Sequence, residues 1–380
     1  MKQIRKITVL LLSVIMIFTL AACSTPAADA PAADAPATEA PEATAPAADG
    51  TVYEFTFGHQ WSATSQQETE LIQRWIKDVA DATDGHVIIT SYPGNVLTAA
   101  TDNYQGVVDG IQDIGAVPYG YSAGRFPVVE AFTLPGLSSF NNAAAASYAM
   151  NDAIEILDPE ELHDTSHLFT FSTGASALLS SVPVRTMEDN KGLSLGVTQG
   201  ERARMLELLG ATPVSLPVPE WYDALQKNLI VGGIMSPEAL FGGTRLGEVT
   251  GEYITNSGLY ACTMFYVTMN KEKFATLPAE YQEVLTTLPD YFATAWDGFA
   301  LGGIVFTKEQ HEVEIIALSK EEEDRWREAM APIIDDNLKM LNDRGLDGEA
   351  IHKLVREMEE KWNAEYPHKL RDMIEAEVGA

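Results

Sequence analysis

The sequence is poor in cysteine, in basic residues and in long apolar runs, and each shortage excludes a class of protein. Only Cys23 and Cys262 occur among 380 residues, too few for a disulfide framework. Lys and Arg number 25 against 55 Asp and Glu, which gives a formal net charge of -30. A charge of that sign repels nucleic acid and anionic lipid headgroups. An anionic ligand therefore needs a local positive site.

The only long apolar run, Ile7–Leu20, follows a basic start and leads into Leu20-Ala21-Ala22-Cys23. This layout is typical of a secretory signal, and the run is short for a membrane span. The small residues before the cysteine resemble a bacterial lipobox, which implies that Cys23 is lipidated. The alternative is an ordinary secreted protein with a chance cysteine at the cleavage site. We expect residues 1–22 to be removed and the protein to be lipid-anchored outside the cytoplasmic membrane, in the periplasm or on the membrane's outer face.

The segment that follows the cysteine lacks the residues that form a hydrophobic core. Residues 24–50 contain no aromatic, large aliphatic or basic residue and consist mainly of Ala, Pro, Asp, Glu and Thr. Such a segment cannot bury enough apolar surface to fold. We therefore expect residues 23–50 to be a disordered acidic tether between the membrane and a folded part.

Alternating apolar residues predict strands from residue 51 onward, and helix start signals fall between them. Val52–Phe57 alternates and ends at Gly58, and Ser65–Glu68 has the spacing of a capping box. Further strands are expected at residues 86–92, 114–117, 168–172, 193–198, 229–235 and 259–269, and further helices at about 104–108, 201–209, 349–362 and from a second capping box at Ser319. This order predicts mostly parallel sheets covered by helices.

The folded part is too long for one comfortable core. About 330 residues exceed the usual size of a single domain, which predicts two α/β lobes. A ligand pocket is then expected between the lobes, at the carboxyl ends of the strands.

One motif raises the possibility of catalysis. Gly120-Tyr121-Ser122-Ala123-Gly124 fits G-x-S-x-G, in which a serine nucleophile stands between a strand and a helix. Pro127 discourages the helix that the motif needs, and no later histidine has a diagnostic spacing. A lipid-anchored serine hydrolase that uses Ser122 is therefore the alternative function, and a loop beside a ligand pocket is the preferred interpretation.

Metal and nucleotide motifs are weak or missing in the sequence. His163 and His167 are four residues apart, but Asp164, Thr165 and Ser166 between them favour a turn over a helix. The sequence contains no Walker loop, no G-x-G-x-x-G and no cysteine–histidine array. We expect no metal, no cofactor and no enzymatic activity.

Several short stretches, in order, resemble the solute-binding proteins of TRAP (tripartite ATP-independent periplasmic) transporters, the DctP family. The matching stretches are Phe57-Gly58, Tyr92-Pro93, Gly106, Gly110–Ile114, Phe126-Pro127, Leu134-Pro135, Glu188–Leu193, Leu209–Val214, Glu220–Gln226, Met269–Lys271 and Leu277-Pro278. The resemblance implies a two-lobed periplasmic-binding-protein-like α/β fold with a hinge and a long late helix. It also implies closure on one small organic solute, such as an organic or aromatic acid, and delivery to a membrane permease. A receptor that feeds a sensor kinase is another possibility.

The resemblance also implies how the lobes divide the chain. Lobe 1 is expected to comprise residues 51–173 plus about 263–305. Lobe 2 is expected to comprise residues 174–262 plus about 306–380.

The chain departs from the family at the residue that usually clamps a carboxylate. That residue is an arginine at the end of a Lys-Gly-Leu-x-Ile-Arg strand, and here the run Lys191–Gly196 ends in glycine. Ser176 stands where one branch of the family has a second arginine, and the usual Val-Asp-Gly reads Ile230-Val231-Gly232. The solute either lacks that carboxylate or meets a different positive group.

Two arginines on the next expected helix could replace the clamp. Arg202 and Arg204 both follow the strand closely, and a solvated helix face is the alternative role for each. Loop positions after the expected strands supply the other candidates, with Thr173 and Ser176 at the lobe crossing. We expect the ligand to contact His59, Gln60, Trp61, Tyr119, Tyr121, Ser176, Thr198, Arg204, Met235, Ser236 and Glu238. Trp61 and Tyr121 would suit stacking against a flat ring, or would simply pack the lobes together.

Overall fold

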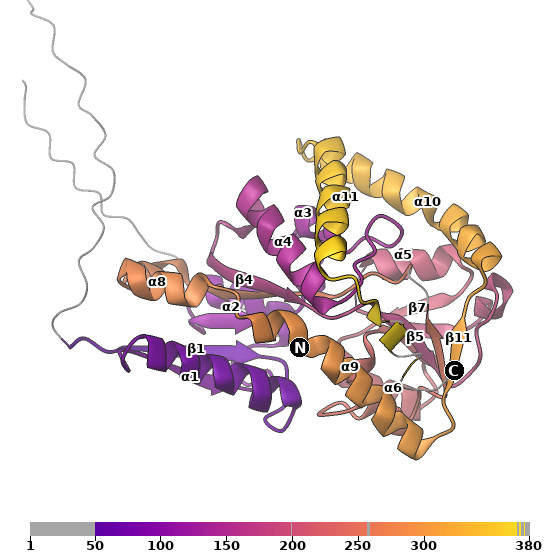
Figure 1. The fold of residues 1–380 in the computed structure, drawn as a ribbon, viewed down its shortest axis with the longest axis horizontal. Helices are drawn as coiled ribbons and strands as arrows, with labels where there is room; N and C mark the ends of the chain where they lie inside the picture. The colour runs from indigo at the N-terminus through magenta and orange to yellow at the C-terminus, as the bar shows by residue number, and fades with distance from the viewer. Residues whose placement is uncertain (1–49, 199, 257–258, 371, 374–375, 377–380) are drawn as a thin grey trace, which may run out of the picture. The chain divides into compact units, whose positions relative to one another are not determined.

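The computed structural model describes residues 50–380, except 199, 257–258, 371, 374–375 and 377–380. These residues belong to one compact unit of the chain, built from two β-sheets and covering helices (Figure 1). The predicted signal segment, the lipidated Cys23 and all but the last residue of the predicted tether lie outside the described residues. Within the described part, no helix is both long and apolar enough to cross a membrane.

The first sheet has five strands in the order β2-β1-β3-β10-β4. Its parallel part, β1 to β3, comes from the start of the folded chain, as the alternating pattern predicted. The strands are β1 (Tyr53–His59), β2 (Val87–Tyr92), β3 (Ile114–Ala116), β4 (Ser166–Ser172) and β10 (Met264–Met269).

The second sheet has six strands in the order β11-β9-β5-β8-β6-β7. All six strands are four residues long, and the sequence pattern located only two of them, those at residues 194–197 and 232–235. The strands are β5 (Ala177–Ser180), β6 (Ser194–Val197), β7 (Thr212–Ser215), β8 (Gly232–Met235), β9 (Tyr253–Asn256) and β11 (Glu314–Ala317).

Each sheet contains one antiparallel strand, and the chain enters each of these two strands directly from a strand of the other sheet. The chain passes from β4 into β5, and it returns from β9 into β10. β10 runs antiparallel to β3 and β4, and β5 runs antiparallel to β8 and β9. Mostly parallel sheets are therefore confirmed, with β5 and β10 as the exceptions.

The two linking segments lie side by side and are bonded to each other. The Thr173 amide donates to the Thr263 carbonyl at 2.9 Å, and the Thr263 amide donates to the Thr173 hydroxyl at 3.0 Å. Both threonines are buried. This paired crossing is the strand part of the hinge that the family resemblance implied.

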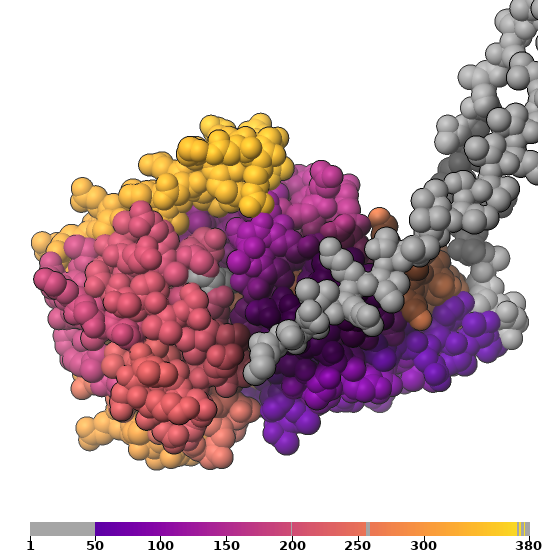
Figure 2. Space-filling model, turned by 180° about the vertical axis from the view of Figure 1, so that it is seen from behind, coloured from indigo at the N-terminus to yellow at the C-terminus, as the bar shows by residue number. Residues whose placement is uncertain are grey.

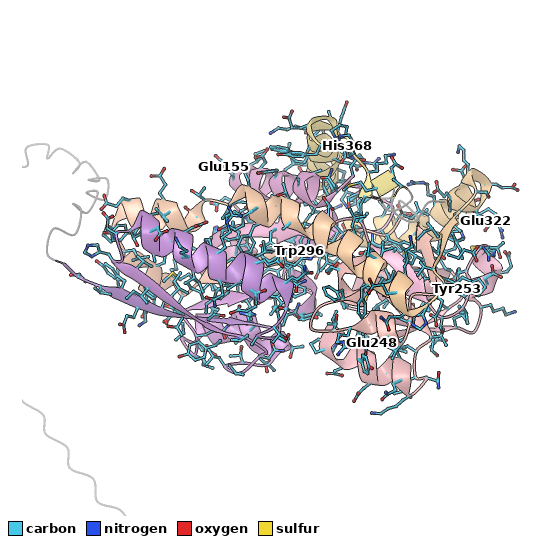
Figure 3. The ribbon with its side chains drawn as sticks, turned by 60° about the horizontal axis from the view of Figure 1, so that its bottom comes forward. Glu155, Glu248, Tyr253, Trp296, Glu322 and His368 are labelled. Carbon is cyan, nitrogen blue, oxygen red and sulfur yellow. The ribbon has the colours of Figure 1, made fainter. Side chains whose placement is uncertain are left out.

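Helices cover both sheets, and the last three are the longest. They are α1 (Gln73–Ala82), α2 (Asn103–Val108), α3 (Pro127–Phe132), α4 (Ala143–Leu157), α5 (Gly200–Leu208), α6 (Trp221–Gln226), α7 (Lys271–Ala275), α8 (Ala279–Thr286), α9 (Asp290–Gln310), α10 (Lys320–Asp343) and α11 (Gly348–Glu365). α9 packs on β4 and α4 at one end and on the 3-10 turns of residues 237–240 and 246–248 at the other, so it is a long late helix that contacts both halves (Figures 1 and 3). α11 packs against α4 and α3, although the expected boundaries assign it to lobe 2. Figure 2 shows the yellow α10 and α11 along one side of the body.

Each predicted capping box forms only one of its two hydrogen bonds, the one accepted by the serine hydroxyl. The Ser65 hydroxyl accepts from the Glu68 amide at 3.2 Å, and the Ser319 hydroxyl accepts from the Glu322 amide at 3.2 Å. The two glutamate side chains turn elsewhere: Glu68 pairs with His59, and Glu322 pairs with Arg325. The first of these helices begins as a π-helical turn over Gln67–Ile72, next to the cavity described below.

A buried carboxyl group joins α9 to α4 near the crossing. Both oxygens of Asp297 accept from the Ala143 amide, at 3.1 and 3.2 Å, and Asp297 is 9% exposed. Burial raises the pKa of Asp297 to about 7. In the folded protein this group therefore holds its proton to a higher pH than in the unfolded chain.

The substitution Asp297→Asn is expected to change how stability depends on pH. Because the folded-state pKa of Asp297 is raised, its contribution is intact below about pH 4 and is lost as pH rises towards 7, by on the order of 3 kcal/mol. The asparagine carbonyl still accepts from Ala143 but does not titrate. Urea unfolding at pH 5 and pH 8 should show a smaller loss for the variant than for the wild type. An equal loss in both proteins would contradict this assignment.

Candidate ligand-binding site

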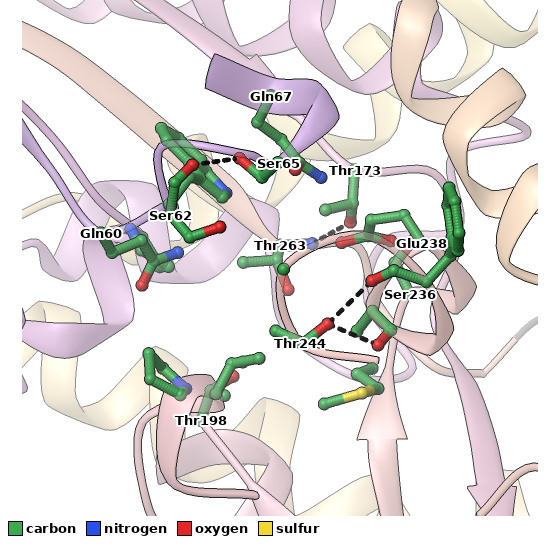
Figure 4. A pocket seen from close by; sticks show the side chains of 18 of the residues that line it. Gln60, Ser62, Ser65, Gln67, Thr173, Thr198, Ser236, Glu238, Thr244 and Thr263 are labelled. Atoms are coloured by element: carbon green, nitrogen blue, oxygen red, sulfur yellow. Dashed lines mark hydrogen bonds between the residues drawn. The ribbon is translucent and has the colours of Figure 1, made fainter. Parts of the chain in front are cut away.

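A cavity of about 410 Å³ lies between the two sheets, beside the crossing. Its walls come from both halves of the fold, and several polar side chains point into it (Figure 4). The residues that line it are Gln60, Trp61, Ser62, Ser65, Gln67, Pro118, Tyr121, Thr173, Thr198, Arg202, Val218, Pro219, Tyr222, Met235, Ser236, Glu238, Ala239, Phe241, Gly243, Thr244, Arg245, Glu248, Thr263 and Phe265. A volume of this size suits a small solute.

An aromatic cluster forms the first-sheet side of the cavity. The Trp61 ring lies 5.3 Å from the Phe265 ring, 6.0 Å from Trp296 and 6.1 Å from Phe171, measured between centroids. Phe265 and Phe171 stack at 5.0 Å with an interplanar angle of 3°. This packing fixes Trp61 while leaving part of its surface on the cavity, where it can contact an apolar ring.

A buried hydrogen-bonded network holds the segment that carries Gln60 and Trp61. His59 Nε2 lies 2.9 Å from the Glu68 carboxylate and 3.0 Å from the Ser91 hydroxyl. His59 is fully buried, and its ring lies 5.5 Å from the Trp61 ring. The hydrogen bonds from His59, Gln73 and Ser91 lower the pKa of Glu68 against the opposing effect of burial. His59 thus positions the cavity wall without lining it.

Arg202 is the buried cation of the site. It lies in the first turn of α5, lines the cavity and is 1% exposed. Its Nη2 atom donates to the carbonyls of Ala261 (2.6 Å) and Cys262 (2.8 Å) and to the Ser176 hydroxyl (3.0 Å). These partners lie on both linking segments. Burial lowers the pKa of Arg202 to about 10, so it stays charged at neutral pH.

The remaining nitrogens of Arg202 leave hydrogen-bonding capacity unused. Nε and Nη1 are buried and have no hydrogen-bond partner among the described residues. A buried donor without a partner costs about 1–3 kcal/mol, and more when the group is charged. A carboxylate bound in the cavity would provide charge-assisted acceptors for these donors.

Glu238 is the second ionisable group on the cavity wall, in the 3-10 turn after β8. Its Oε2 atom is buried and has no partner among the described residues. Burial raises the pKa of Glu238 to about 7, while the side chains of Ser236 and Trp296 and the charge of Arg202 act in the opposite direction.

The glycine at the usual clamp position is explained by a tryptophan. A Cβ atom on Gly196 would lie 2.8 Å from Cζ2 and Cη2 of Trp221 and 3.0 Å from Cδ1 of Ile230. Trp221 is 1% exposed, and it also fills the space beside Gly233. A large side chain therefore cannot leave β6 at residue 196, and the nearby cation comes from α5.

The family profile of the bacterial extracellular solute-binding proteins, family 7, matches residues 57–340. The chain belongs to this family. Its members are receptors, not enzymes, and the family and the two-sheet fold together identify the protein as a TRAP-type solute-binding protein.

Solved structures support the family assignment. A TRAP solute-binding protein of an unidentified marine microbe, specific for aromatic acids and bound to meta-hydroxyphenylacetate, is 27% identical and superposes with a TM-score of 0.77, covering 82% of this chain and 99% of that one. A TRAP solute-binding protein of Desulfovibrio salexigens is 29% identical with a TM-score of 0.71, covering 81% and 96%.

Curated relatives are more distant. The ectoine/5-hydroxyectoine-binding periplasmic protein of Ruegeria pomeroyi is 26% identical over 280 residues, which is 71% of this chain and 81% of that protein. A solute-binding protein of Albidiferax ferrireducens and a protein of Salmonella typhimurium match over only 64% and 60% of their own lengths.

The structure places seven of the predicted ligand residues on the cavity of this solute-binding protein. They come from the ends of strands in both halves and from the turn before α3, as the loop argument assumed. They are Gln60, Trp61, Tyr121, Thr198, Met235, Ser236 and Glu238, and Thr173 at the crossing lines the cavity with them. Their contact with a ligand remains a prediction.

Four predicted residues are not part of the cavity lining. His59 holds the wall from behind, and Tyr119 is buried with its hydroxyl 2.7 Å from Thr170. Ser176 is not on the cavity wall, but its hydroxyl accepts a hydrogen bond from Arg202, which is. Arg204, the arginine chosen from the sequence, is 47% exposed and faces Glu207 and Asp336, because two residues along a helix turn the side chain to the opposite side.

The helical period could have selected Arg202. Met205 and Leu206 of α5 and Leu209 beyond it are buried, and Arg202 lies three, four and seven residues before them on the same face. No comparable signal exists for Ser62, Thr263 or Phe265, which reach the cavity only through the tertiary fold.

The alternative catalytic and metal motifs do not assemble. Ser122 follows a 3-10 turn and borders a separate surface crevice lined by Thr101, Tyr104, Gln105, Ala123 and Arg125, without a histidine. His163 lies in a turn beside Asp158, whereas His167 lies in β4. Within the described part of the chain, no group of three or more His, Cys, Asp or Glu is placed to hold a metal.

The substitution Gly196→Ala is expected to destabilise the protein by about 1–3 kcal/mol, because the added methyl group overlaps the Trp221 ring. Gly298→Ala in the exposed part of α9, where a Cβ meets nothing within 4 Å, should be neutral or stabilising. Chemical denaturation of both variants tests the difference. A Gly196→Ala protein as stable as the wild type would show that the space is not closed by Trp221.

Proposed function

We propose that this protein captures a small organic acid, preferably one with an aromatic or other flat ring, and delivers it to a TRAP-type permease. The observation that carries the proposal is Arg202, a buried cation on the wall of a cavity of suitable size, with two nitrogens that have no partner in the part of the chain that the structure describes. On a chain with a formal charge of -30, such a site supplies the local positive potential that an anion requires.

Aromatic side chains favour a ring-bearing acid. Trp61, Tyr121 and Phe265 line the cavity, and Trp61 is fixed by its aromatic neighbours. The marine relative binds meta-hydroxyphenylacetate, and a relative of Bordetella bronchiseptica that is 25% identical binds mandelate. In this chain we assign the acid group to Arg202 and the ring to the side of Trp61.

We further propose that the mature protein is held at the membrane through a lipid on Cys23. The sequence around Cys23 supports this assignment, and the acidic segment after it would separate the binding domain from the membrane surface. A lipid-anchored receptor stays close to its membrane permease, so the solute is released near that partner.

The anchor is tested by detergent partitioning in a bacterial host. Wild-type protein is expected in the detergent phase of a Triton X-114 separation, and Cys23→Ser protein in the aqueous phase or retained as the uncleaved precursor. Metabolic labelling with a clickable fatty acid should mark the wild type alone. Equal fatty-acid labelling of the two proteins would contradict a lipid on Cys23.

Binding of the acid is tested with two arginines on one helix. After a thermal-shift screen over aromatic and aliphatic acids, the best acid is titrated by calorimetry into wild type, Arg202→Gln and Arg204→Gln. Loss of a charge-assisted hydrogen bond predicts about 10- to 100-fold weaker binding for Arg202→Gln, and no change for Arg204→Gln, because Arg204 faces solvent.

The fold of each variant is checked first by circular dichroism, and Arg202→Lys serves as a second variant that keeps the charge. Lysine lacks the planar fork and is expected to bind the acid more weakly than the wild type. Unchanged affinity in Arg202→Gln, or equal losses at the two arginines, would overturn the assignment of the acid group.

A further inference from the structure

Two charged groups on the second-sheet side of the cavity have opposite hydrogen-bonding needs. Arg202 presents Nε and Nη1, which can only donate, and Glu238 presents Oε2, which only accepts when the carboxyl group is ionised. All of these atoms are buried and lack partners among the described residues. Both side chains line the same cavity.

The two groups are neighbours, but they do not satisfy each other. The charge of Arg202 lowers the pKa of Glu238, and the charge of Glu238 raises the pKa of Arg202. The hydrogen bonds of Arg202, however, go to neutral groups, namely two carbonyls and the Ser176 hydroxyl. The two groups therefore form no closed ion pair, although both residues line the same cavity.

Protein donors near Glu238 do not form a hydrogen bond with its Oε2 atom. The Tyr121 hydroxyl accepts from the Val218 amide at 3.3 Å. The Ser236 hydroxyl and the Trp296 indole N–H lower the pKa of Glu238, and both are buried without a hydrogen-bond partner among the described residues. A donor on the solute would give Oε2 the partner that it lacks.

We propose that the solute carries a hydroxyl or ammonium donor close to its acid group and that Glu238 selects for this donor. The inference rests on the proposed function, because it places the acid group at Arg202. A plain acid such as benzoate or phenylacetate would pair with Arg202 but leave the buried Glu238 oxygen without a partner. A site of this kind rejects the analogue that lacks the donor, because its own polar group is then desolvated and unpaired.

The test compares acids that differ only in the donor, at about pH 8, where a carboxyl with a pKa near 7 is ionised. The pairs are mandelate with phenylacetate, phenylglycine with phenylacetate, and 3-hydroxybenzoate with benzoate. Each is titrated by calorimetry into the mature protein, Glu238→Gln, Glu238→Leu and the control Glu272→Leu, whose side chain is exposed on α7. We expect a preference of about 10-fold or more for the donor-bearing acid in at least one pair, in wild type and control alike.

The variants separate the two kinds of donor. Glu238→Gln keeps a neutral acceptor and should retain part of a preference for a hydroxyl but lose a preference for an ammonium, whereas Glu238→Leu should lose both. Acids that bind without a preference, or with one that survives in Glu238→Leu, would overturn donor selection and leave the proposed function intact. Failure of every acid to bind the wild type would overturn both. Plain-acid affinity in Glu238→Leu shows that this variant still folds around a working Arg202.

Discussion

The three hydrogen bonds of Arg202 Nη2 are the contact on which the site depends. They join the first turn of α5 to the two paired linking segments, through Ser176 on one and Ala261 and Cys262 on the other. Burying this cation is costly, as its lowered pKa shows. The cost is offset in part by the carbonyl oxygens, and an anionic solute would offset more. A solute bound to the free nitrogens would therefore act on the same group that ties the two halves together.

Glycine in place of the usual clamp arginine goes together with a different packing of the cavity wall near Arg202. Trp221 occupies the space that a side chain at Gly196 would need, and it packs against β6 and β8. The positive charge therefore comes from Arg202, at the start of α5, and not from residue 196 in the preceding strand β6. On the other side of the cavity, the buried His59 and Glu68 pair fixes the segment that carries Trp61. The cavity therefore has one charged wall and one aromatic wall, each held from behind.

The sequence was sufficient for elements with a clear local period and insufficient where the period is absent. The alternation in β1 and the start signal at Ser319 located their elements closely. α4 begins with four alanines, and α9 is apolar on much of its surface, so neither shows an amphipathic stripe and both were missed. Strand ends predicted the loops of the site well. Arg204, expected from the sequence, faces solvent, whereas the helical period places Arg202 on the buried face of α5. Phe265 reaches the cavity because β10 begins at the crossing.

The central claim is that Arg202, delivered from α5, replaces the strand arginine as the anion-binding group. A crystal structure of the protein with an acid selected by thermal shift tests this directly. We expect a solute carboxylate within about 3 Å of Arg202 Nε or Nη1, with the Nη2 bonds to Ser176, Ala261 and Cys262 retained. A carboxylate held by other groups, with Arg202 bonded only to the two linking segments, would show that this arginine is structural and would contradict the account.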